Sequence, residues 1–131
     1  YFFRGFFHFM LMTYWGGLPY VDSYLTGEET ITLPRLSYQA TADKVADDLQ
    51  HAADILPNDW DETSVGQATL GKNNQRINKM TALAFLGKNY LYAGSPLMNK
   101  ASGGSAAYNA DYCKKAADAL GQMLKLAEST V

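Results

Sequence analysis

The first fifteen residues are almost all apolar or aromatic, and this run ends abruptly in Gly16-Gly17-Leu18-Pro19. A helix that is apolar on every side must be surrounded on every side, either by protein or by lipid. A bilayer span needs about 20 consecutive apolar residues, whereas this run is shorter and contains Arg4 and His8. We therefore expect a helix over residues 1–15 that is buried between other helices.

The composition predicts a folded chain that does not bind nucleic acid. Its 131 residues, 47% hydrophobic and 18% charged, suffice for one domain with a real core. The net charge is −2 and the basic residues form no stripe. A single cysteine, Cys113, excludes an internal disulfide and a cysteine-based zinc site. Because the chain starts at Tyr1, inside an apolar run, we expect residues 1–131 to be one segment of a larger protein.

Three further segments have helical patterns. Ser37 is a candidate N-cap for a helix over residues 38–56, whose apolar residues recur at helical spacing until Pro57. Asn78 is a candidate cap for a helix over residues 78–94. The last pattern spans residues 109–127 and has an acidic residue in its first turn, which suits the helix dipole.

These patterns predict an all-α fold of antiparallel helix pairs. The last two helices are typical of a tetratricopeptide-like pair, although the insert 96–108 breaks the strict repeat period. We expect residues 20–36 and 59–75 to be irregular, so the architecture is of the α-solenoid type with long loops. One continuous core should bury eight residues: Phe6, Phe9, Met10, Leu49, Leu83, Ala84, Tyr90 and Leu120.

No pattern predicts catalysis, a metal or a cofactor. The two histidines, His8 and His51, have no His or carboxylate partner at metal-ligand spacing. We expect His8 to be packed or hydrogen-bonded in its helix and His51 to be solvated. Four aspartates (Asp43, Asp47, Asp48 and Asp54) lie on one helix. Paired carboxylates can hydrolyse glycosides, but we interpret this run as the solvent-exposed face of the helix.

Aromatic residues in loops are the candidate binding residues. Five of them lie in or next to loops, where exposed rings would suit carbohydrate stacking or a protein interface: Tyr20, Tyr24, Tyr38, Trp60 and Tyr108. Trp60 lies between Asp59 and Asp61, and Tyr108 precedes Asn109. We predict Trp60 with Asp59 and Asp61 as the first choice of ligand contacts, and Tyr108 with Asn109 as the second. The alternative is that Trp60 only packs its loop against the helices.

Three blocks in the right order resemble the SusD/RagB family of nutrient-binding outer-membrane lipoproteins. The first block has Arg4, an aromatic run and Tyr14-Trp15-Gly16-Gly17-Leu18-Pro19. The second has Pro34-Arg35-Leu36-Ser37 followed by Asp48-Leu49, small residues and Leu56-Pro57. The third has Gln75-Arg76-Ile77-Asn78-Lys79 and ends in Tyr90-Leu91-Tyr92-Ala93-Gly94. The chain departs from the family pattern at Gln75, where glycine is usual, and at Ala40 and Ala42.

The resemblance implies a function for the whole protein. Family members are similar to tetratricopeptide scaffolds whose irregular loops bind glycans, and they are not enzymes. They lie at the cell surface, lipid-anchored in the outer membrane, and pass oligosaccharide to a TonB-dependent transporter of the SusC type. This chain would supply part of the scaffold, with its lipid anchor outside residues 1–131. The matched motifs are structural and imply no ligand contacts.

Two other functions stay open at this point. One is a generic tetratricopeptide adaptor that binds a protein partner, although the sequence shows no repeated set of clamp residues. The other is an all-α glycosidase fragment, which would need two carboxylates about 5–10 Å apart in a cleft.

Overall fold

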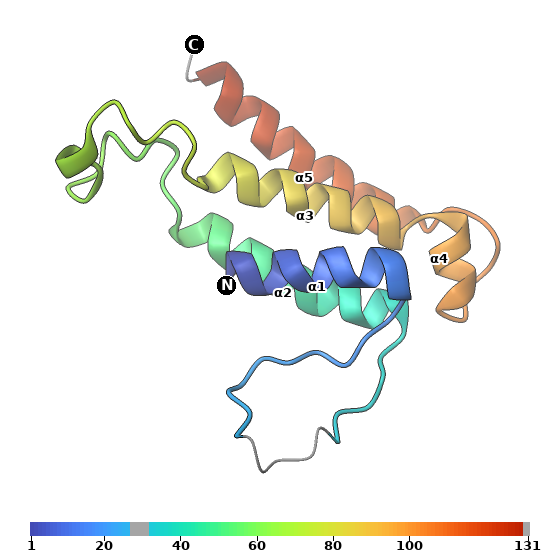
Figure 1. Ribbon diagram of the computed structural model, residues 1–131. Helices are drawn as coiled ribbons and strands as arrows, with labels where there is room; N and C mark the ends of the chain where they lie inside the picture. Colours follow the sequence, from blue (N-terminus) through green and yellow to red (C-terminus); the bar gives the residue numbers. More distant parts are fainter. Residues whose placement is uncertain (27–31, 130–131) are drawn as a thin grey trace.

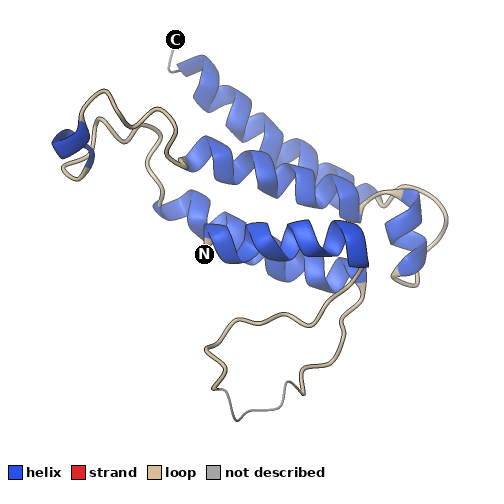
Figure 2. Ribbon diagram, in the orientation of Figure 1, coloured by secondary structure: helices blue, strands red, loops and turns tan. Residues whose placement is uncertain are grey.

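The computed structural model describes residues 1–26 and 32–129, and this part of the chain is all-α (Figure 2). The elements are α1 (Phe2–Trp15), α2 (Tyr38–Ile55), the 3-10 turn η1 (Gly66–Thr69), α3 (Lys79–Ala93), α4 (Pro96–Ala101) and α5 (Ala110–Ser129). The four predicted helices are confirmed within two residues at each end. The sequence did not predict η1, which lies in a segment that we expected to be irregular, or α4, which lies in the insert 96–108.

The four long helices lie side by side, and each runs antiparallel to the next along the chain (Figure 1). Helix α2 packs between α1 and α3, and α5 packs on α3. Two long loops and α4 extend from the ends of this layer (Figure 1). The loop between α2 and α3 lies at the opposite end from α4.

The helix starts follow from local hydrogen bonds. The Ser37 hydroxyl accepts from the Ala40 amide at 3.2 Å, and the Asn78 side chain accepts from the Thr81 amide at 3.0 Å. Both predicted caps are therefore confirmed. Ser95 caps α4, whose first residue is a proline with the fixed φ that a first turn needs.

The predicted core is confirmed in part. Phe9, Leu49 and Leu83 are buried, and Phe6 and Tyr90 are partly buried against the core. Ala84 and Leu120 are half-buried. The prediction for Met10 is wrong, because its side chain is 38% exposed.

Helix α1 is not covered on every side, which corrects our expectation from its apolar sequence. Within the described residues only α2 and α3 pack on it, and they bury Phe2, Gly5, Phe9 and Met12. The other side of the helix exposes six large apolar residues: Phe3, Phe7, Met10, Leu11, Tyr14 and Trp15. None of the described helices is both long and apolar enough to cross a membrane.

A buried carboxylate joins α1 to α2. Asp48 accepts two hydrogen bonds of 2.5 Å from the Arg4 guanidinium and one of 2.6 Å from the Tyr20 hydroxyl. The expectation that all four aspartates of α2 are solvated is therefore wrong for Asp48, although Asp43, Asp47 and Asp54 are exposed. Burial alone would raise the pKa of Asp48. The hydrogen bonds from Arg4 and Tyr20 outweigh burial and hold that pKa below its ordinary value.

The loop after α1 is tied to the same network. The ring of His8 stacks on the Tyr20 ring at 4.0 Å, and its Nε2 accepts from the Val21 amide at 3.2 Å. His8 Nδ1 therefore carries the proton and donates to the Arg4 carbonyl at 2.9 Å. His8 is hydrogen-bonded in its helix, as predicted, and His51 is exposed.

The first two sequence blocks meet in space. Gly16 ends α1 with φ of 79°, which favours glycine, and a Cβ on Gly17 would lie 2.1 Å from the Leu36 carbonyl oxygen. The Arg35 guanidinium donates to the Gly17 and Trp15 carbonyls at 2.7 and 2.6 Å. The Gly-Gly-x-Pro turn and the Pro-Arg-x-Ser segment therefore hold each other and close the loop between α1 and α2.

Candidate functional site

The base of the loop between α2 and α3 is closed by backbone and amide contacts. The Lys79 amide donates to the Pro57 carbonyl at 2.9 Å, and the Asn78 side-chain amide donates to the Asn58 carbonyl at 3.1 Å. Because Asn78 also caps α3, one asparagine both starts the helix and fixes the beginning of the loop. The predicted contact Trp60 follows two residues after Asn58.

The first turns of this loop are tightly built around Trp60. The Trp60 carbonyl accepts from the Thr63 amide at 3.0 Å and from the Thr63 hydroxyl at 2.7 Å. Gly66 packs against the same carbonyl, so closely that a Cβ on Gly66 would lie 1.7 Å from its oxygen. These contacts fix the backbone that presents the Trp60 ring.

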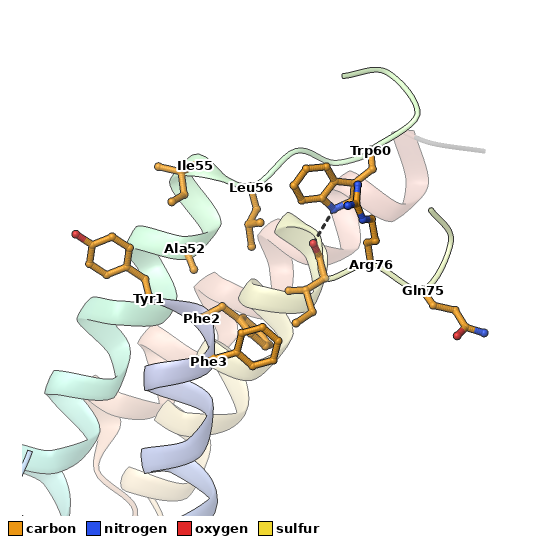
Figure 3. Close-up of a pocket in the computed structure, with 10 residues that line it drawn as sticks. Tyr1, Phe2, Phe3, Ala52, Ile55, Leu56, Trp60, Gln75 and Arg76 are labelled. Atoms are coloured by element: carbon orange, nitrogen blue, oxygen red, sulfur yellow. Dashed lines mark hydrogen bonds between the residues drawn. The ribbon is translucent and has the colours of Figure 1, made fainter. Parts of the chain in front are cut away.

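The Trp60 side chain is half-buried and held at one edge and one face. Its Nε1 donates to the Ile77 carbonyl at 2.8 Å, and the Arg76 guanidinium lies 4.8 Å from its ring centroid (Figure 3). A cation over an indole ring is attracted by the ring quadrupole. Trp60 therefore makes packing contacts of the kind that the alternative interpretation expects. Its side chain also lines two hollows.

The first hollow, which we call the apolar hollow, has a volume of about 540 Å³. Figure 3 shows how side chains from the start of α1, the end of α2 and both ends of the loop surround it. Most of its lining is aromatic or aliphatic: Tyr1, Phe2, Phe3, Ala52, Ile55, Leu56, Trp60, Gln75, Arg76 and Ile77. It offers extensive apolar contact and few hydrogen-bonding groups.

The second hollow, which we call the asparagine hollow, also contains Trp60 and Arg76 and has a volume of about 310 Å³. Four of its eight lining residues are asparagines: Asn58, Asp59, Trp60, Asn73, Asn74, Arg76, Asn78 and Met80. An aromatic ring offers a face for stacking, and polar groups beside it can fix the orientation of a polar ligand. The predicted Asp59–Trp60 pair therefore lies at the edge of a polar concavity.

The two predicted aspartates have different surroundings. Asp61 is half-buried and its carboxylate accepts from the Gly71 amide at 3.1 Å and from the Asn73 side-chain amide. Asp59 is exposed, and its Oδ1 accepts from the Asp61 amide at 2.8 Å. Asp61 thus holds two parts of the loop together, whereas Asp59 keeps a carboxylate oxygen at the hollow. That either one binds a ligand stays a prediction.

The second predicted pair lies elsewhere. Tyr108 is 71% exposed, and the Asn109 side chain accepts from the Tyr112 amide at 3.3 Å at the start of α5. The Trp60 loop and residues 102–109 lie at opposite ends of α3 (Figure 1). Fifteen helical residues span about 22 Å, so the two pairs do not form one site. Of the other loop rings, Tyr20 and Tyr38 are buried, which contradicts our expectation, and Tyr24 is 90% exposed.

Sequence reasoning missed the partners that complete the hollow. Arg76 and Asn74 belong to the run Asn73-Asn74-Gln75-Arg76, which lies fourteen or more residues after Asp59 in the chain. The only available signal was this cluster of amide side chains next to an arginine. Nothing in the sequence indicated that the loop folds back and places the cluster beside Trp60.

A scan against protein-family models matched residues 1–91 to a SusD-like model, whose description is "starch-binding associating with outer membrane". No significant match was found among curated proteins or among solved structures. The matched range contains the first two sequence blocks and the third as far as Leu91, together with α1, α2, the Trp60 loop and most of α3. Because the match covers more than two thirds of the 131 residues, the chain belongs to the SusD-like family of starch-binding proteins that associate with the outer membrane.

Proposed function

We propose that this chain is part of a cell-surface glycan-binding lipoprotein that captures oligosaccharide for a TonB-dependent transporter of the SusC type. The family description supports binding of starch and association with the outer membrane. The two hollows that Trp60 lines supply a place where a sugar can bind. In this proposal a lipid anchors the protein to the outer membrane, and the helices hold the loop at the surface.

The mechanism is capture without covalent chemistry. The C–H face of a pyranose packs on an aromatic ring, while amide, carboxylate and guanidinium groups bind its hydroxyls. A loop that already has its bound shape loses little conformational entropy on binding. The contacts of Trp60 with Ile77, Thr63 and Arg76 supply such a pre-formed ring. No proton transfer or bond cleavage is required, in keeping with a family of binding proteins.

We also propose that the chain is one segment of a larger helical scaffold. The support comes from the exposed side of α1, where Phe3, Phe7 and Leu11 are each at least 50% exposed. Contiguous apolar surface of this kind marks an interface in soluble proteins. A solenoid covers its inner helices with neighbours and keeps polar faces for its ends, so α1 has the composition of an inner helix.

Glycan titration of the full-length protein by isothermal calorimetry tests the binding function. We would titrate a panel of oligosaccharides led by maltoheptaose, a starch fragment, into the wild type and into Trp60→Ala. Loss of a stacking ring should weaken binding by roughly 1–3 kcal/mol, the scale of truncating a binding anchor. Tyr24→Ala is the matched control, because Tyr24 is a ring that is 90% exposed and lies in the loop between α1 and α2.

A third variant separates stacking from packing. Trp60→Phe keeps an aromatic face but loses the hydrogen bond to Ile77, so it should keep most of the affinity if stacking is what matters. Equal affinities of wild type and Trp60→Ala would assign Trp60 to packing alone. Failure of the whole panel to bind would contradict glycan capture itself.

A further inference from the structure

We propose that the asparagine hollow, and not the apolar hollow, receives the ligand, and that it selects an uncharged sugar unit by the free amides of Asn58 and Asn74. This inference rests on the proposed glycan-binding function and adds the subsite and the side chains that contact the sugar. It depends on which polar groups around Trp60 are already used by the fold and which are not.

Two of the four asparagines are used by the fold. The Asn73 side chain is 5% exposed and donates to the Gly66 and Thr69 carbonyls at 3.0 Å each, while its Oδ1 accepts from the Thr69 hydroxyl at 2.7 Å. The Asn78 side chain caps α3 and donates to the Asn58 carbonyl. Neither side chain has the freedom to adapt to a ligand, and both set the shape of the hollow.

The other two asparagines have unused side-chain amides. Asn58 and Asn74 are exposed, and in the part of the chain that the structure describes no hydrogen bond involves either side chain. Each amide offers two donors and one acceptor. A sugar hydroxyl is itself both a donor and an acceptor, so a pair of such amides matches a pair of hydroxyls. The two residues come from opposite ends of the loop, and both line the hollow.

The charges around the hollow favour an uncharged sugar. Between Pro57 and Asn78 the chain carries three acidic residues, Asp59, Asp61 and Glu62, against Lys72 and Arg76. Arg76, the lining cation, forms no ion pair among the described residues and lies over the Trp60 ring. The hollow itself carries one acid and one base, Asp59 and Arg76. An anionic sugar would meet no net positive charge there and would be repelled by the like charge of Asp59.

The apolar hollow lacks the groups that a sugar needs. Of its ten lining residues only Gln75 and Arg76 carry polar groups on long side chains, apart from the edges of Tyr1 and Trp60. A hydroxyl buried there without a partner would lose its bonds to water at a cost. The polar hollow avoids this cost because its amides replace those bonds.

The test is calorimetry on the full-length protein, which compares a variant lacking both free amides with a control variant lacking one amide elsewhere. In Asn58→Ala/Asn74→Ala we remove both free amides, and in Gln122→Ala we remove an exposed amide that lines a separate hollow beside α5. The probes are maltoheptaose and other uncharged oligosaccharides, with tri-galacturonic acid as the anionic probe. Loss of two hydroxyl contacts should raise the Kd for the bound uncharged sugar about tenfold or more, and Gln122→Ala should bind like the wild type.

The outcomes separate this inference from the proposed function. One outcome is that the wild type binds an uncharged sugar and that Trp60→Ala weakens this binding, whereas the double variant does not. The ligand would then contact Trp60 outside the asparagine hollow. This inference would be wrong, while glycan capture would stand. Tighter binding of tri-galacturonic acid than of every uncharged probe would also overturn it. Failure of every probe to bind would overturn both proposals. Circular dichroism and the thermal midpoint verify that each variant is folded, and the single variants replace the double one if it is not.

Discussion

The hydrogen-bonded group around Asp48 should be a major source of stability, and Arg4→Met tests this. The Asp48 side chain is 5% exposed and receives both hydrogen bonds from Arg4, whose own side chain is 35% exposed. Removing the partner of a buried charge costs about 3–5 kcal/mol. Because water can reach the partly exposed Arg4 side of the pair, we expect a smaller loss for Arg4→Met, about 2–3 kcal/mol.

The same group should make stability depend on pH in acid. The pKa of Asp48 lies below its ordinary value in the folded chain. A carboxyl of this kind stabilises the fold above its unfolded pKa of about 4. That contribution is lost as the pH falls through the lowered folded-state pKa. Arg4→Met removes the cause of the lowering, so its free energy of unfolding should depend less on pH below about 4.

Urea unfolding of the full-length protein, followed by far-ultraviolet circular dichroism at pH 7 and pH 3, measures both effects. Tyr20→Phe is a second test of the same group. It removes one hydrogen bond to the Asp48 carboxylate and should lower the free energy of unfolding by about 1.5–3 kcal/mol. A loss below about 0.5 kcal/mol for Arg4→Met, typical of an exposed ion pair, would refute the reasoning. So would an acid dependence equal to that of the wild type.

Three further substitutions have outcomes that unfolding curves can check. Leu49→Ala empties a fully buried site and should cost about 2–5 kcal/mol; a loss well under 1 kcal/mol would place Leu49 outside the core. Gly17→Ala would bring a Cβ to 2.1 Å from the Leu36 carbonyl oxygen, so it should destabilise the protein clearly, and a neutral result would contradict the close packing of that turn. Asn78→Ala should cost about 1 kcal/mol through the lost cap to Thr81, and unchanged stability would mean that solvent replaces the cap.

The helices were predictable because their signals are local. Ser37 and Asn78 cap their helices through side chains three residues from the amides they accept from, and glycine or proline lies at or just after the predicted ends of the first three helices. Apolar spacing likewise identified Leu49 and Leu83 as core residues. Patterns of this kind depend on neighbours within one or two turns, so no knowledge of the tertiary fold was needed.

The errors concern contacts between residues distant in sequence. In the sequence Asp48 belongs to a run of acidic residues that we expected to be solvated. Its burial becomes favourable only because Arg4, forty-four residues earlier in the chain, donates hydrogen bonds to it. Met10 belongs to an apolar helix whose sequence does not say which side is covered. Tyr20 lies in a loop but is buried because its hydroxyl reaches Asp48.

The sequence indicated Trp60 as a candidate binding residue, and that role stays a prediction. An indole between two acids in a loop was a visible signal, and the structure places Trp60 at two hollows. The return of the loop, which brings Asn74 and Arg76 to the ring, depends on the contacts of Asn73, Gly66 and Asp61. Such a network has no periodicity that a sequence could reveal.

A crystal structure of the full-length protein with maltoheptaose, or with the uncharged oligosaccharide that binds best in calorimetry, tests the central claim most directly. We predict a sugar ring in the asparagine hollow, with its hydroxyls within hydrogen-bond distance of Asn58 and Asn74 and its C–H surface against Trp60. A bound oligosaccharide elsewhere on the protein, with the hollow beside Trp60 empty, would contradict the claim that this loop captures the glycan.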